Sequence, residues 1–196
     1  MNEIGISNKI KYTLALSMIF LVIVLSTIYI NLRKTANESE KETAILNLLK
    51  TVENIHLNTQ ILENSKSEYL KTGQDIFLAD YQAASKKLRQ ENNLLLLLSI
   101  KNNFEKENII QLSNAINKKI LYANRVVDIK RFLENNLEDV HYYDSIGNGQ
   151  TQFIFLTGDK VEKKGIDFLQ NTAHERESYT KRLTWLFVIL GILFFI

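Results

Sequence analysis

The chain has 196 residues, which is room for one domain with attached segments. Its formal net charge is +2 and 23% of its residues are charged, so the charge balance gives no reason to expect a nucleic-acid partner. Cysteine and proline are absent from the sequence, which excludes disulfides and thiolate metal sites and allows long helices to continue without a proline break.

Near the N-terminus, the segment Tyr12–Ile30 reads "YTLALSMIFLVIVLSTIYI" and contains no charged residue. As a helix it would span about 28 Å, close to the hydrocarbon thickness of a bilayer. A cleaved signal peptide is the alternative, but its apolar core is usually only about 7–15 residues long and precedes a small-x-small cleavage site. We therefore predict a transmembrane helix over residues 12–30, with residues 1–11 as a cytoplasmic tail.

At the other end, the segment 183–196 reads "LTWLFVILGILFFI" and would reach only about 21 Å as a helix. We interpret it as the start of a second transmembrane helix that is truncated before its cytoplasmic continuation; a short C-terminal anchor is the alternative. Basic residues flank the first span on both sides, so the positive-inside rule hardly decides the orientation. The short tail and the long intervening loop favour an inner-membrane, multi-pass protein with residues 31–182 outside the cytoplasm.

Between these two segments, apolar residues recur at alternating steps of three and four, the spacing of a buried helical seam. The first seam has polar interruptions at Thr59 and Lys66. We expect one helix along each of three seams, formed by Ile45, Leu48, Val52, Ile55, Thr59, Leu62, Lys66 and Tyr69; by Phe77, Tyr81, Ala84, Leu88, Leu95 and Leu98; and by Ile109, Leu112, Ile116, Ile120, Ala123 and Val127.

The first predicted corner between helices lies in "LKTGQD". Gly73, after Thr72, suits the left-handed residue that closes a helix, and Asp75 can cap the next helix by accepting its unpaired N–H groups.

A second corner is predicted in "LTGDKVE", where Gly158 precedes Asp159 and Glu162 at the spacing of a capping box. The stretch "DSIGNGQTQ" marks another break, and "TQFIFL" is interpreted as a helical turn or capping segment, because a single strand would have no partner. The predicted fold class is all-α: an antiparallel four-helix bundle between two transmembrane helices.

The segment "SEYLKTGQDIFLADYQAASKKLRQENNLLLLL" resembles the second-helix signature of type-three CHASE sensory domains. "FLTGDKVEKKGIDFLQNTAHERE" is similar to the closing helix of that family. The matching positions are Leu70, Thr72, Gly73, Phe77, Leu78 and Tyr81 in the first segment, and Gly158, Ile166, Asp167 and Glu175 in the second.

This resemblance implies an extracytoplasmic four-helix bundle placed between two transmembrane helices, at the head of histidine kinases, diguanylate cyclases or chemoreceptors. We therefore expect the sensory input region of a bacterial receptor, most of all a sensor histidine kinase, that relays a stimulus through its last helix. A chemoreceptor-type module and a structural envelope protein are the alternatives, and the residues that follow Ile196 in the gene would distinguish them. We also expect a homodimer, while the small-molecule or protein ligand stays unknown.

No catalytic pattern stands out in the sequence. His56, His141 and His174 are scattered, and "HERES" lacks the second histidine of a His-Glu-x-x-His metal motif. "GNGQTQ" lacks the third glycine of a dinucleotide loop and is interpreted as a loop. We therefore predict no enzymatic activity in this chain, and no cofactor or metal.

Three tyrosines, Tyr122, Tyr142 and Tyr143, are candidates for lining a small-molecule pocket. Packing is the more common role of aromatic residues at such positions, and it is the interpretation we favour.

Overall fold

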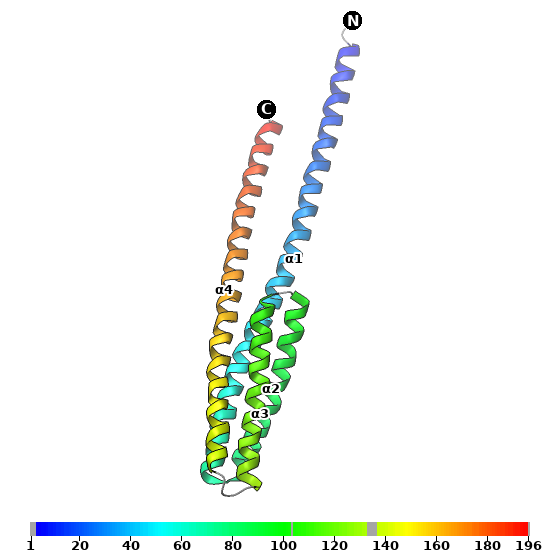
Figure 1. Ribbon diagram of the computed structural model, residues 1–196. Coiled ribbons are helices and arrows are strands. Elements are labelled where there is room, and N and C mark those ends of the chain that lie inside the picture. The colour runs from blue at the N-terminus through cyan, green and yellow to red at the C-terminus, as the bar shows by residue number, and fades with distance from the viewer. Residues whose placement is uncertain (1–2, 103, 133–136, 196) are drawn as a thin grey trace. The chain divides into compact units, whose positions relative to one another are not determined.

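The computed structural model describes residues 3–102, 104–132 and 137–195, and it consists of four α-helices (Figure 1). They are α1 (Glu3–Thr72), α2 (Asp75–Asn102), α3 (Lys106–Phe132) and α4 (Leu137–Phe195). No strand occurs in these ranges, which confirms the all-α class.

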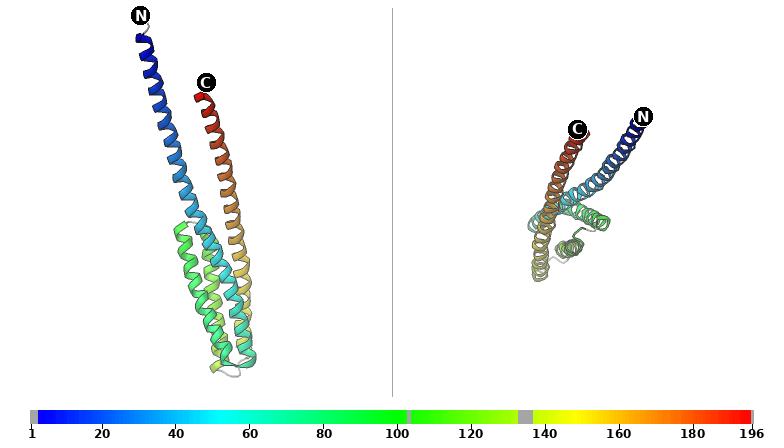
Figure 2. Two further views of the ribbon diagram at one scale, coloured as in Figure 1. Left: turned by 180° about the vertical axis from the view of Figure 1, so that it is seen from behind. Right: turned by 90° about the horizontal axis from the view of Figure 1, so that it is seen from above.

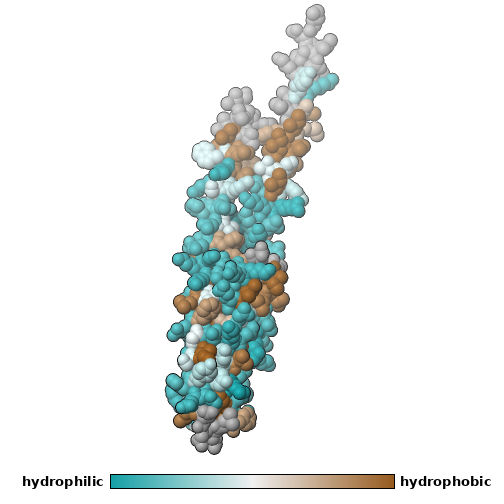
Figure 3. Space-filling view, viewed as in Figure 1, coloured by the Kyte–Doolittle hydropathy of each residue, from teal (hydrophilic) through white to brown (hydrophobic). Residues whose placement is uncertain are grey.

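The chain divides into two units, residues 1–42 and residues 43–196. The first unit is the N-terminal part of α1, in which large apolar side chains are exposed; Figure 3 shows them gathered along this segment. Polar side chains here bond to the helix itself: Ser17 Oγ donates to Leu14 O and Thr27 Oγ1 to Ile23 O, both at 2.8 Å. By length and composition this helix could cross a membrane, as predicted for residues 12–30.

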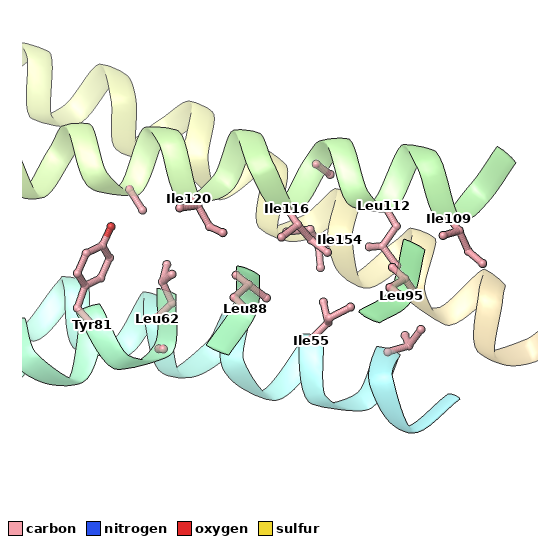
Figure 4. Packing of buried hydrophobic residues seen from close by; sticks show 14 of the residues in the cluster. Ile55, Leu62, Tyr81, Leu88, Leu95, Ile109, Leu112, Ile116, Ile120 and Ile154 are labelled. Carbon is pink, nitrogen blue, oxygen red and sulfur yellow. The ribbon is translucent and has the colours of Figure 1, made fainter. Parts of the chain in front are cut away.

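In the second unit, side chains from all four helices share one hydrophobic core (Figure 4). Every position of the first predicted seam, from Ile45 to Tyr69, is buried, including the polar Thr59 and Lys66. The third seam is also buried throughout, whereas the second is buried except at Phe77 and Leu98, which are partly exposed. The spacing of apolar residues therefore located the core of these three helices correctly.

Successive helices of the second unit reverse direction, so that α2 lies beside α3 and α3 lies beside α4 (Figures 1 and 2). Between α1 and α2, Gly73 has a φ of 68°, in the left-handed region, and its N–H donates to Tyr69 O at 2.8 Å. Thr72 Oγ1 donates to Glu68 O at 2.7 Å, and Asp75 begins α2. The chain therefore turns at the predicted corner.

The turn between α2 and α3 includes Glu105, which has a φ of 44° although it is not a glycine. Its side chain accepts hydrogen bonds from Asn108 Nδ2 at 2.5 Å and Lys164 Nζ at 2.9 Å. Its carbonyl accepts the N–H of Ile109 at 3.0 Å. These bonds hold the end of the turn to α3 and α4.

Helix α4 corrects two predictions. It continues through residues 144–152, where a break was expected, and through Gly158, Asp159 and Glu162, where a corner was expected. Gly158 serves packing instead: a Cβ atom there would lie 2.8 Å from His56 Cε1 and 3.2 Å from Val52 Cγ1. At Gly165 a Cβ atom would lie 2.7 Å from Leu49 Cδ2. These glycines therefore allow α1 and α4 to approach closely. The segment "TQFIFL" is helical and forms no strand.

Candidate functional site

Four charged residues from three helices meet inside the second unit and form what we call the ion cluster: Glu63 and Lys66 of α1, Lys119 of α3 and Asp144 of α4. Lys66 Nζ lies 2.9 Å from Glu63 Oε2 and 2.5 Å from Asp144 Oδ1. Lys119 Nζ pairs with Glu63 Oε1 and donates to Gly147 O at 3.1 Å. The side chains of Lys66 and Lys119 are only 3% and 0% exposed.

The two ammonium groups are buried because of where their residues stand in the helices. Lys66 occupies a seam position of α1 between Leu62 and Tyr69, and Lys119 stands next to the buried Ile120 of α3. Taking a charge out of water is costly unless an opposite charge and hydrogen bonds compensate for it. The cluster supplies two positive and two negative side chains, so its charges balance.

Lys119 shows the effect of this environment on protonation. Burial lowers the pKa of Lys119 to about 8 from its ordinary 10.5, and the negative charge of Asp144 partly offsets that decrease. The ammonium group therefore remains charged at pH 7 and keeps its ion pair with Glu63.

A second group of ionisable residues lies where α1 packs on α4; we call His56, Asp159 and Glu162 the histidine–carboxylate cluster. One nitrogen or oxygen from each residue lies within 4.8 Å of the other two. His56 Nδ1 is 3.8 Å from Glu162 Oε1, and the His56 ring packs on Phe155 with centroids 4.7 Å apart. Burial raises the pKa of Glu162, with the charge of His56 opposing this shift and those of Asp159 and Glu53 adding to it.

This cluster was missed by the sequence reasoning, which assigned Asp159 and Glu162 to a capping box and found no metal motif around His56. The capping box was wrong, because both residues lie within α4, where they come close to His56 of α1. No local signal could have placed them against His56, because the partners lie on different helices far apart in the sequence. The other two histidines, His141 and His174, are exposed.

The three tyrosines singled out from the sequence do come together at the junction of α3 and α4. Tyr143 lies between the others, with its ring centroid 6.3 Å from Tyr122 and 5.2 Å from Tyr142. Arg125 Cζ lies 5.9 Å from the Tyr143 ring. The rings pack on one another, which agrees with the packing interpretation.

A shallow groove of about 450 Å³ runs between α3 and α4, and Asn114, Lys118, Gly149 and Phe153 are among its lining residues. Gly149 belongs to the stretch that was expected to form a loop, and it is helical. Neither charged cluster contributes a lining residue to this groove. The two clusters are therefore the arrangements with the strongest chemical character in the described ranges.

No protein-family model, curated protein or solved structure matches this chain.

Proposed function

We propose that this chain is the sensory input region of a bacterial transmembrane signalling receptor, most of all of a sensor histidine kinase. In this proposal residues 31–182 form an antiparallel four-helix bundle outside the inner membrane, between two membrane-spanning helices. The resemblance of residues around Gly73 to type-three CHASE domains supports it, as does the continuity of α4.

The observation that carries the proposal is that α4 is one helix from Leu137 to Phe195. Its first half contributes Ile154 and Val161 to the hydrophobic core, both 0% exposed. Its second half ends in an apolar stretch in which Trp185 is 67% and Ile189 54% exposed. A rigid helix that has one end in a packed core and the other in an apolar segment would transmit a displacement of the core to that segment.

Exposed apolar side chains support the membrane part of the proposal. The residues from Tyr12 to Ile30 in α1, and those from Trp185 to Ile189 in α4, include large apolar side chains without protein cover. Such surface is unfavourable in water and favourable in hydrocarbon.

We further propose a homodimer; Leu94, Leu97 and Ile100 give α2 an exposed apolar stretch for a second copy (Figure 3).

Insertions into α4 test the signalling role. Each added residue turns a helix by about 100°, so two residues inserted between Glu177 and Ser178 rotate everything that follows by about 200°. Seven residues restore the original face to within about 20°. In a chimera that joins residues 1–182 to the second transmembrane helix and kinase of a reporter receptor, the two-residue insertion should lock or reverse kinase output, and the seven-residue insertion should largely preserve it.

Equal output from both insertions would show that helical phase is not transmitted, and the sensory proposal would then lose its mechanism. The outcome would favour a structural protein of the envelope. Western blots of membrane fractions provide the control that both chimeras reach the same abundance.

A further inference from the structure

The histidine–carboxylate cluster combines the donor atoms that a divalent transition metal prefers. Asp159 and Glu162 are three residues apart on α4, so both carboxylates lie on the side of the helix that faces His56 of α1. The three donor atoms lie within 4.8 Å of one another. An imidazole nitrogen with carboxylate oxygens is a common ligand set for zinc.

The separation of these atoms is better suited to an ion between them than to direct contact. His56 Nδ1 and Glu162 Oε1 are 3.8 Å apart, which is longer than the roughly 2.7–3.2 Å of a nitrogen–oxygen hydrogen bond. Two ligand atoms that each lie about 2.1 Å from a metal are separated by roughly 3–4 Å. Small side-chain adjustments would therefore bring all three donors to bonding distance.

The position of the imidazole depends on Gly158. A side chain at this position would overlap the His56 ring, because a Cβ atom would lie 2.8 Å from Cε1. The ring also packs on Phe155 of the same helix, with centroids 4.7 Å apart. These two contacts with α4 hold His56 beside the carboxylates, as a metal ligand requires.

The second ring nitrogen of His56, Nε2, does not fix which of the two nitrogens carries the proton. His56 Nε2 is buried and has no hydrogen-bond partner among the residues that the structure describes. Because no partner commits Nε2 to being the acceptor, Nε2 can carry the proton while Nδ1 offers its lone pair. Buried polar atoms are usually paired, so this atom is unusual in a helix contact that is otherwise well packed.

From these observations we propose that His56, Asp159 and Glu162 bind one divalent transition-metal ion of the Zn²⁺ class between α1 and α4. Water would complete the coordination on the outer side, since Asp159 is exposed. Glu53 lies three residues before His56, and its charge reaches Glu162, so it adds negative charge that favours a cation. The site goes beyond the proposed function and does not depend on it, because a chain without a signalling role would bind the ion through the same side chains.

Titration calorimetry with ZnCl₂ on the untagged chain in detergent micelles tests the proposal. Binding of one Zn²⁺ per chain is expected, together with a rise in the melting temperature. His56→Gln and Asp159→Asn should each weaken binding at least tenfold. His174→Gln is the matched control, because His174 is an exposed histidine of α4 outside the cluster, and it should bind as tightly as the wild type.

Asp159→Asn keeps the test decisive if His56→Gln fails to fold, since it changes an exposed side chain. A third measurement uses the wild type alone: Zn²⁺ should shift the ¹⁵N resonance of His56 Nδ1 and leave those of His141 and His174 unchanged. A wild-type chain that binds no Zn²⁺ would overturn the proposal. Unaltered binding in Asp159→Asn, with an unchanged Nδ1 resonance, would overturn it equally.

Discussion

Helix α1 packs against α4 by different means in two neighbouring regions of the second unit. Around Gly158 and Gly165 the missing side chains allow Val52 and Leu49 to lie against the α4 backbone. Around Asp144 and Gly147 the same two helices are joined by ammonium and carboxylate groups, with Lys119 of α3 as a third participant. The glycine region therefore depends on shape, and the ion cluster depends on complete pairing of charges.

The two regions therefore tolerate different substitutions. A contact that depends on shape is damaged by added atoms, since a dense core has no spare volume. A cluster that depends on pairing is damaged by removing one charge, because the partners stay largely shielded from water without compensation. Three experiments test this contrast between the glycine region and the ion cluster.

The largest effect is expected when Lys66 becomes methionine. Lys66→Met removes the charge that joins Glu63 to Asp144, and it should lower the free energy of unfolding by about 3 kcal/mol. Urea denaturation of a fragment spanning residues 35–180, followed by circular dichroism, measures the loss.

Lys71→Met is the matched control for this change. Lys71 pairs with Glu68 at 2.9 Å, the same distance and the same three-residue spacing as Lys66 with Glu63, but its side chain is 66% exposed. Exposed pairs contribute about 0–1 kcal/mol, so the control should be nearly neutral. Similar losses in both variants would mean that burial does not distinguish the ion cluster from a surface pair.

A smaller loss is expected in the glycine region. Gly158→Val places new atoms against His56 and Val52, and overpacking of this kind should cost about 2 kcal/mol. Gly149→Ala on the same helix meets nothing within 4 Å and should stabilise the fold by up to about 1 kcal/mol through helix propensity. If Gly158→Val melts at the wild-type temperature, close approach is not what the glycine provides.

The smallest effect is a pH dependence of stability that arises in the ion cluster, from the titration of Lys119. The pKa of Lys119 is about 8 in the folded chain and 10.5 ordinarily, so between these values the unfolded chain binds more protons. The free energy of unfolding should therefore rise with pH in this window, by about 1.5 kcal/mol from pH 8 to pH 9.5. Below pH 8 the destabilisation that comes from burying the charged Lys119 side chain is fully present.

Urea denaturation at several pH values measures this slope, and Lys119→Met should lack it. The range stops short of pH 10 because burial and the charge of Asp128 raise the pKa of Tyr81, whose ionisation in the unfolded chain would act in the opposite direction. The same slope in Lys119→Met would assign the titration to another group.

The predictability of the fold from sequence differs along the chain for a physical reason. The core of α1, α2 and α3 follows from apolar spacing, because residues such as Ile55 and Ile116 recur with the period of a helix. Gly73 was predictable as well, since a left-handed residue is required where a helix closes. A glycine in α4 has a different role, because Gly158 allows a close contact with another helix and closes none.

The candidate sites were less accessible to sequence reasoning. Lys66 stands out in the sequence only as a polar interruption of a seam, and its partner Asp144 lies in a stretch that predicts a break between helices. His56 becomes a candidate ligand only after α1 and α4 are packed together, so its role depends on tertiary contacts that local patterns do not encode.

The ion cluster also fixes the register between α1 and α4. Sliding one helix past the other by a turn would move Lys66 about 5.4 Å along the axis, beyond the reach of its bond to Asp144 Oδ1. Apolar side chains such as Ile55 could find new neighbours after such a slip, but a buried ammonium group could not. The buried charges thus select one longitudinal alignment out of the several that a regular apolar seam would accept.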